Sequence, residues 1–422
     1  MKQLFTALLL LFTSWIAYPS QGQNTSYDLV VYGGTSGGVA AAIQMARMGK
    51  SVILIEPSNH LGGLTTGGLG ATDIGNKDVI GGISLEFYQT IKAYYDNPEA
   101  WKYEDRLDYL RRPDQTRSNE GEEAMWTFEP SVAMKVYKKM LAEENIVVLM
   151  NKRLNRATGV KTNNNRITSI TMESGETYSG KMFMDATYEG DLMAASGVSY
   201  TTGREANSQY GETLNGVQAN FYNLTLKGNV SRNAIHHNFV PGVDPYVVKG
   251  DPSSGLLPFI IEGGPGLDGT ADKGIQAYCY RMTLTNHPEN RIPFEKPANY
   301  NELEYELLFR NYEAANGPIE KMYHYGDPLV PWINTPMPNK KTDTNNQKGF
   351  STDFIGQNFD YPEASYADRE AYSQRQLEYQ QGLMWSLAYH PRIPKKVRDV
   401  VSKWGMTKDE FKDRNISRKE RI

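Results

Sequence analysis

The sequence predicts an α/β protein in which a doubly wound, Rossmann-like domain precedes an α+β domain. Three observations support this fold class. Two short apolar runs, at 29–32 and 51–55, flank a glycine-rich turn and a helix-forming stretch. A helix, a strand and a meander of strands with a glycine turn follow between 132 and 184. The remainder mixes short alternating runs with a few long helical stretches and has no internal repeat.

The first strand–helix–strand unit has the layout of a dinucleotide site. Its turn is glycine-rich and consists of Gly33, Gly34, Thr35, Ser36, Gly37 and Gly38. A helix N-terminus behind such a turn presents unpaired N–H groups and a partial positive charge, which attract a pyrophosphate. Glu56 ends the second strand at close to the expected spacing of about 20 residues, where an acid binds a ribose diol and disfavours a 2′-phosphate. Thr35 replaces the middle glycine of G-x-G-x-x-G, and a purely structural turn is the alternative.

A second glycine-rich loop follows Glu56 directly and contains two glycine doublets. Glycines allow backbone N–H groups to line a concave site without side chains in the way. We interpret this loop as a further phosphate or ribityl contact, and a flexible surface loop is the alternative. The candidate contacts in it are Pro57, Gly62, Gly63, Leu64 and Thr65.

The next elements complete the first domain. The patterns predict a helix over 80–95, a charged surface excursion over 97–123, a helix over 132–144, and strands at 146–150, 166–172, 177–180 and 181–184. In two-dinucleotide-type flavoproteins, a helix, a strand, a meander and a last strand ending in Ala-Thr-Gly close the FAD domain. Here the last strand ends in Ala186, Thr187 and Tyr188. An ordinary hairpin is the alternative.

The second half is expected to provide the substrate side. The predicted elements are a β-rich region over 207–261, a strand over 275–284, helices over 300–314, 368–388 and 394–404, and a polar loop over 338–346. Alternation on the predicted strand places Tyr278 on one face and Arg281 on the other. Arg281 could hold an anionic substrate group or be a paired structural arginine. The polar loop, which carries Asp343, could cover the cofactor or be solvated.

Composition excludes several classes of function. The chain has 422 residues, a net charge of −4 and 39% hydrophobic residues, which suits two globular domains. It has no basic stripe for nucleic acid. Cys279 is the only cysteine, so the chain forms no internal disulfide and supplies no iron–sulfur cluster. The six histidines lack metal-ligand spacing, and no metal is predicted.

The first 22 residues have the pattern of a signal peptide. Lys2 precedes an apolar core over 4–17, and a small-x-small site lies at Ser20 to Gly22. The apolar run is short for a stable membrane span, although an uncleaved anchor is the alternative. We therefore expect export to the periplasm or the outside of the cell.

These segments together resemble a known family. The chain is similar to exported bacterial FAD-dependent oxidoreductases, a group associated with heterodisulfide-reductase-subunit-A-like proteins and sometimes labelled xanthan lyase. The segments that carry the likeness are VVYGGTSGGVAAAIQMARMGKSVILIEP, HLGGLTTGGLGATDIG, MDATYEGDLMAASGVSYTTGRE, IQAYCYRMTLTNHPENRIPF and PNKKTDTNNQKGFSTDFIGQNFDYPEA. The resemblance implies FAD held by 33–38, Glu56 and the Gly62–Gly63 loop, with Ala186, Thr187 and Asp191 nearby and the backbone of Leu154 beside the adenine. Relatives continue past WGMTKDEF, so the chain is expected to lack a closing segment.

The combined prediction is a signal peptide at 1–22, an FAD-binding domain at 23–197, a substrate domain at 198–391 and a truncated helical segment at 392–422. The expected reaction is hydride transfer from a polar small molecule, such as a carbohydrate, to the flavin N5. Candidate catalytic residues are Arg281, Asp343, His60 and Tyr278. The sequence does not indicate the electron acceptor. Alternatives are an inactive or weakly FAD-binding fragment, a polysaccharide lyase and a non-redox binding protein.

Overall fold

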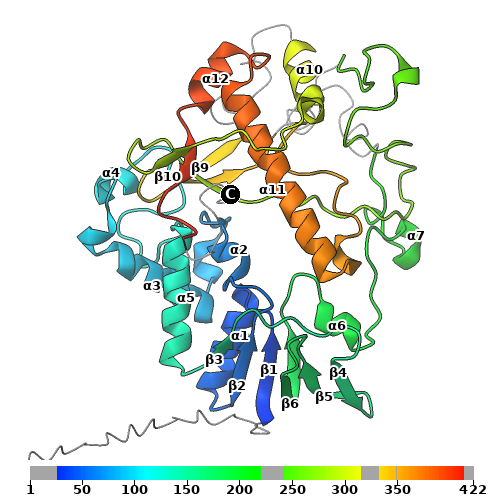
Figure 1. Cartoon of the computed structure of the whole chain (residues 1–422). Coiled ribbons are helices and arrows are strands. Elements are labelled where there is room, and N and C mark those ends of the chain that lie inside the picture. Colours follow the sequence, from blue (N-terminus) through cyan, green and yellow to red (C-terminus); the bar gives the residue numbers. More distant parts are fainter. Residues whose placement is uncertain (1–25, 220–238, 240–241, 315–331, 348, 413–422) are drawn as a thin grey trace, which may run out of the picture.

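The computed structural model describes residues 26–219, 239, 242–314, 332–347 and 349–412. The predicted signal peptide, the tail after 412 and part of the region predicted to be β-rich lie outside these residues. Two sheets organise the described chain, one at the lower end in Figure 1 and one in the upper half. No helix in the described ranges is both long and apolar enough to cross a membrane.

The first sheet has six strands in the order β3-β2-β1-β6-β5-β4. They are β1 (Ser26–Tyr32), β2 (Val52–Ile55), β3 (Val147–Leu149), β4 (Val160–Asn163), β5 (Arg166–Thr171) and β6 (Thr177–Asp185). Strands β3, β2, β1 and β6 are parallel, whereas β5 runs antiparallel to β6 and β4. Tyr32 pairs with Ile55 on one side and with Asp185 on the other. The carboxyl ends of β1, β2 and β6 therefore meet at one edge, which is where a parallel α/β sheet binds its ligand.

Both faces of this sheet are buried, which explains the continuous apolar runs of β1 and β2. One face packs under α1 (Ser36–Arg47), α3 (Gly82–Tyr95) and α5 (Pro130–Glu143). The other face packs against Leu154, Ile170, Met172 and Leu192, the last from α6 (Asp191–Ala195). The structure thus confirms the predicted Rossmann-like α/β architecture.

The stretch between α3 and α5 is not the surface excursion that the sequence predicted. It contains a short turn of helix, η2 (Pro98–Ala100), and α4 (Arg106–Leu110). Tyr109 of α4 is fully buried and donates a hydrogen bond to Thr127 Oγ1 at 2.7 Å. Most of the charged residues are exposed, but Tyr109 and the ion-paired Glu104 are buried and anchor the segment, which composition alone does not reveal.

The second sheet is antiparallel, in the order β8-β11-β7-β10-β9. Its strands are β7 (Met282–Thr285), β8 (Arg291–Pro293), β9 (Ile333–Met337), β10 (Lys341–Asn345) and β11 (Gly405–Thr407). Helices α10 (Glu306–Ala314), α11 (Tyr366–Tyr389) and α12 (Lys395–Val401) pack into the same hydrophobic core. The predicted C-terminal helical segment therefore also contains β11, which pairs with β7 and β8.

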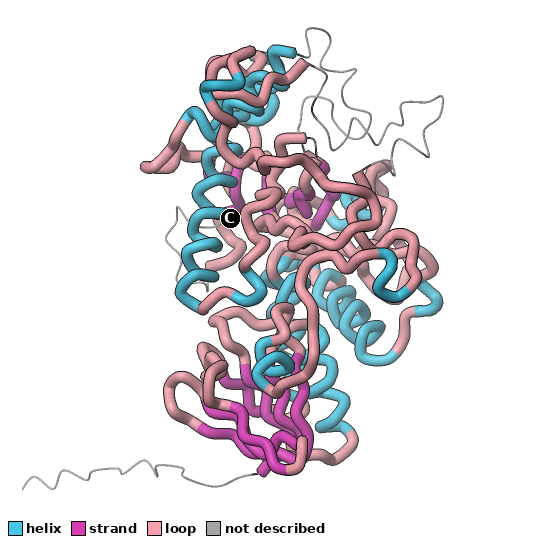
Figure 2. The backbone as a smooth tube through the Cα atoms, turned by 90° about the vertical axis from the view of Figure 1, so that its right-hand side faces the viewer, coloured by secondary structure: helices cyan, strands magenta, loops and turns pink. Residues whose placement is uncertain are grey.

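Three predictions for this half need correction. The polar loop over 338–346 is mostly the buried strand β10, because salt bridges neutralise its charged side chains. Within the strand predicted over 275–284, only the end is paired, from Met282 onward. The described part of 207–261 contains loops, the short α7 (Asn207–Tyr210), η3 (Pro252–Ser254) and one isolated bridge rather than strands. Figure 2 shows how much of this half is loop.

Candidate functional site

The glycine turn after β1 packs directly on the segment that follows β6. Gly33 has a φ of +107°, and a Cβ there would lie 2.5 Å from the backbone nitrogen of Thr187. A Cβ on Gly38 would lie 2.0 Å from the carbonyl oxygen of Gly33. Thr35 is the N-cap of α1: its hydroxyl accepts from the Gly38 N–H and donates to the Ala186 oxygen at 2.8 Å. The residue that departs from the glycine pattern thus caps the helix and ties the turn to β6.

Glu56, the predicted ribose contact, faces this turn. Its Oε2 accepts a hydrogen bond from the Gly34 N–H at 2.6 Å, and its Oε1 accepts one from the Ser58 N–H at 2.7 Å. The side chain is buried. An ionised carboxylate has about four acceptor positions, so each oxygen keeps a lone pair for a further donor such as a ribose hydroxyl.

The second glycine loop closes over the first. The Gly62 N–H donates to the Gly34 oxygen at 2.6 Å, and the hydroxyls of Ser36 and Thr65 lie 2.6 Å apart. Pro57 follows Glu56 at the start of this loop, and α2 (Gly63–Thr66) begins inside it. The structure therefore brings the turn 33–38, Glu56 and the loop 57–65 together at the carboxyl edge of the first sheet.

Tyr188 occupies part of the same loop. Its hydroxyl accepts the Leu64 N–H at 2.8 Å, and a Cβ on Gly63 would lie only 2.2 Å from that oxygen. Any cofactor atom that uses the Leu64 N–H must displace the tyrosine hydroxyl. The signal was visible in the sequence, because Tyr188 stands where the usual closing strand has glycine.

Two other predicted cofactor contacts already have protein partners. The Leu154 N–H donates to the Tyr32 hydroxyl at 2.9 Å, and its carbonyl accepts from the Tyr366 hydroxyl at 3.2 Å. Asp191 is buried and accepts two hydrogen bonds from Arg369, at 2.7 and 2.8 Å. Tyr366 and Arg369 both belong to the first turn of α11, so the second half of the chain docks on this edge.

The four candidate catalytic residues separate into three places. Arg281 and Asp343 form a salt bridge, with Nε and Oδ1 2.5 Å apart, and Asp343 also accepts the Ala71 N–H at 3.1 Å. Burial raises the pKa of Asp343, and the neighbouring guanidinium opposes that rise. His60 belongs to the second glycine loop, with its Nε2 2.8 Å from Thr66 Oγ1. Tyr278 lines a pocket instead.

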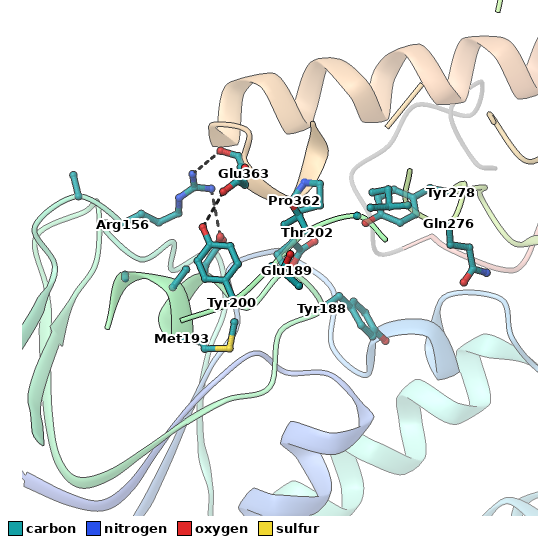
Figure 3. A pocket seen from close by; sticks show the side chains of 17 residues that line it. Arg156, Tyr188, Glu189, Met193, Tyr200, Thr202, Gln276, Tyr278, Pro362 and Glu363 are labelled. Carbon is teal, nitrogen blue, oxygen red and sulfur yellow. Dashed lines mark hydrogen bonds and ion pairs between the residues drawn. The ribbon is translucent and has the colours of Figure 1, made fainter. Parts of the chain in front are cut away.

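That pocket has a volume of about 750 Å³ and opens beyond the end of β6, between α6 and the chain before α11. Its size falls within the range typical of small-molecule sites. Figure 3 shows tyrosine, hydroxyl, amide and carboxylate side chains around it, among them Tyr188, Glu189, Tyr200, Thr202, Gln276 and Tyr278.

Sequence reasoning missed Glu189 in this wall. Its side chain is partly buried, and burial raises the pKa of its carboxyl. The nearby charges of Asp191 and Glu56 raise that pKa as well, whereas Arg369 lowers it. The available signal was an acid just beyond the end of a parallel strand, where α/β proteins place functional residues.

The fold and this edge define a dinucleotide-binding flavoprotein. A model of the FAD dependent oxidoreductase family matches residues 28–417. The chain therefore belongs to the FAD dependent oxidoreductase family, and FAD is its cofactor. The residues at the edge fit that group, because Glu56 retains free lone pairs and the turn 33–38 excludes side chains at Gly33 and Gly38.

Solved structures show weaker likeness. L-proline dehydrogenase from P. horikoshii is 15% identical, with a TM-score of 0.28 over 43% of this chain and 58% of that chain. Thioredoxin reductase from Streptococcus pyogenes is 18% identical, with a TM-score of 0.22 over 39% and 36%. L-amino acid deaminase from Proteus vulgaris is 15% identical, with a TM-score of 0.26 over 39% and 48%. The chain thus spans less than two thirds of each. No curated protein matched.

Proposed function

We propose that the protein oxidises a polar, hydroxylated small molecule of the carbohydrate or polyol class. When bound, FAD supplies the hydride acceptor, the flavin N5. The observation that carries this proposal is the pocket of about 750 Å³ next to the predicted cofactor edge. Its tyrosine rings suit the apolar faces of a sugar, and its hydroxyl, amide and carboxylate groups suit the hydroxyls.

We also propose a division of roles among the predicted cofactor contacts. The turn 33–38 and the N-terminus of α1 would face the pyrophosphate, and Glu56 would hold the ribose. Ala186 and Thr187 would support the turn from below, since Gly33 packs against them. Leu154 and Asp191 would lie at the border of the site, each hydrogen-bonded to a residue of α11, Tyr366 and Arg369 respectively.

The domain division near residue 197 is likewise a proposal. Separate hydrophobic cores surround the two sheets, which supports it. The segment after 391 joins the second sheet through β11 and reaches back to the first domain, because Glu410 Oε2 accepts the Ser131 N–H at 2.8 Å. Export through the first 22 residues is a further proposal, and cell fractionation of the full chain would test it.

The test begins with flavin retention. The chain from Gln23 is purified with added FAD, and flavin absorbance is measured after gel filtration. Gly38→Ala should lose flavin because its Cβ collides with the Gly33 oxygen. Gly37→Ala is the matched control, since its Cβ meets nothing closer than 3.8 Å. Equal retention by both variants would contradict the proposed turn.

The second step tests the substrate class. The retained flavin is exposed without oxygen to aldoses, polyols, uronates and amines, and bleaching of its visible absorbance is recorded. Bleaching by aldoses or polyols supports the proposal. Bleaching by amines alone contradicts the carbohydrate class. Cleavage of a uronate polymer without flavin reduction would favour a lyase.

A weakly FAD-binding protein is the second candidate, and a specific observation favours it. The Leu64 N–H, the Leu154 backbone and the Asp191 carboxylate are all engaged by residues of the chain itself. Cofactor contacts at the Leu64 and Leu154 N–H groups would first require their present hydrogen bonds to break, at a net cost of about 1 kcal/mol each. Flavin that leaves during gel filtration from a folded protein would support this candidate.

A further inference from the structure

We infer that Glu189 accepts the proton of the substrate hydroxyl in this pocket, an inference that rests on the proposed function. Glu189 lies in the pocket wall next to Thr202 in Figure 3. The backbone is fixed on both sides of it. Tyr188 is tied to the Leu64 N–H, and the Gly190 N–H donates to Thr187 Oγ1 at 2.9 Å. The two neighbours of Glu189 are therefore bonded to the loop and the strand end at the edge that carries the glycine turn.

The three acids of the pocket wall differ in their partners. Asp191 is held by two hydrogen bonds from Arg369. Glu363 Oε1 accepts the Tyr200 hydroxyl at 3.0 Å. Glu189 receives no hydrogen bond from any other residue in the described ranges. A carboxylate that lines a pocket with open lone pairs is positioned to accept a proton from a ligand.

Several groups that face Glu189 act on its pKa. Burial raises that pKa most strongly, Arg369 and a hydrogen bond from the backbone of Glu189 itself lower it, and the charges of Asp191 and Glu56 raise it, so that the net change is upward. Arg369 is the positively charged residue near Glu189, and its guanidinium donates hydrogen bonds to Asp191. The hydroxyls of Tyr278 and Tyr361 also lie in the electrostatic field of Glu189 and stay protonated, since burial raises the pKa of both.

The reaction step balances without a further reactant. The substrate H–C–O–H unit loses its hydroxyl proton to the Glu189 carboxylate, and its C–H hydride goes to FAD. The C–O bond becomes a carbonyl, so the substrate loses two electrons and FAD gains two. The neutral Glu189 then returns its proton to water through the open pocket.

Glu189→Gln tests the inference, and Glu173→Gln, which changes an exposed acid outside the pocket, is the matched control. Both variants should retain FAD. With the aldose or polyol that bleaches wild type fastest, Glu189→Gln should reduce flavin about 10²–10⁴-fold more slowly. Its substrate Kd, from the concentration dependence of bleaching, should stay within about threefold. The wild-type and Glu173→Gln rates should fall at acid pH, and that acid limb should vanish in Glu189→Gln.

A second measurement does not depend on turnover. Carbon NMR of glutamate-labelled protein should show a carboxyl that titrates above the ordinary range in wild type and Glu173→Gln and is missing from Glu189→Gln. An unshifted Glu189 carboxyl, or a Glu189→Gln variant with the wild-type pH profile, would overturn the inference. If wild type itself is bleached by no hydroxylated compound, the proposed function fails first, and the inference fails with it.

Discussion

Replacing Lys341 by methionine should destabilise the fold in a pH-dependent way. The Lys341 ammonium is buried among three carboxylates, with Nζ 2.6 Å from Glu129 Oε1, 2.9 Å from Asp409 Oδ1 and 2.6 Å from Glu410 Oε1. The lysine is on β10, Glu129 precedes α5, and the other two acids follow β11. The ammonium thus ties the second sheet to the first domain and occupies the one described group of acids that could otherwise hold a metal ion.

Removing one partner of a buried ion pair costs about 3–5 kcal/mol, because the other charge stays buried without compensation. Two of the acids left by Lys341→Met, Glu129 and Glu410, are almost completely buried. We therefore expect the free energy of unfolding to fall by about 3–5 kcal/mol at pH 7. Methionine keeps most of the apolar contact of the lysine stem, so the loss reports mainly on charge.

The pH dependence has a defined sign. Burial raises the pKa of Glu129, and Lys341 opposes that rise, so the pKa should rise further in the variant. A carboxyl whose pKa is higher in the folded than in the unfolded state favours folding at low pH and loses that advantage as pH rises. The difference between variant and wild type should therefore be smaller at pH 5 than at pH 8.

Urea unfolding followed by circular dichroism at the two pH values measures this difference. Lys340→Met is the control, because Lys340 is far more exposed and its Nζ lies 3.0 Å from Glu104. Its effect should stay below about 1 kcal/mol, because the Lys340 ammonium is partly exposed and the buried Glu104 keeps its ion pair with Arg112. A Lys341→Met variant within about 1 kcal/mol of wild type at pH 7 would refute the reasoning, as would a loss that grows at acid pH.

Three further predictions follow from the edge of the first sheet and its surroundings. Tyr188→Phe removes the acceptor of the Leu64 N–H, so the free protein should lose about 1 kcal/mol of stability, and added FAD should raise its Tm more than it raises that of wild type. Cys279 should react with iodoacetamide at pH 8 far more slowly in the native than in the urea-unfolded protein, because burial raises its pKa to about 12; equal rates would contradict this. Arg369→Met should cost about 3–5 kcal/mol and Asp191→Asn should restore part of that loss, whereas additive effects would exclude coupling between the two residues.

Much of the cofactor edge could be predicted because it depends on local rules. The glycine turn, the helix behind it and the acid at the end of β2 lie within one unit of about 30 residues, and a βαβ unit places them in one way. Glu56 accordingly bonds the Gly34 N–H. Strand β5 and the residues of β6 followed from the turn residues between them, whereas β4 was not predicted and β6 is one strand where two were expected.

What sequence reasoning missed depends on partners far along the chain. The stretch around Lys341 is polar, and its composition predicts a loop. It is a buried strand because three carboxylates from distant parts of the chain neutralise the lysine. The family resemblance placed Asp191 near the cofactor, but nothing local shows that Arg369, in a helix predicted only as a helix, reaches it. Buried charges are stable only with their partners, and a single sequence does not pair them.

These ion pairs between distant residues hold the two halves of the chain together at the cofactor edge. The ion pair of Lys341 joins the second half of the chain to the first domain near α5. The first turn of α11 makes a second contact near α6, through Arg369 and Tyr366 (Figure 1). The glycine turn and the pocket lie at the sheet edge where both contacts are made. Part of the pocket wall comes from the first domain, at Glu189, and part from the second, at Tyr278. The pocket is therefore complete only when the two halves are docked. Loss of either the Lys341 ion pairs or the Arg369–Asp191 ion pair should weaken substrate binding even if FAD stays bound.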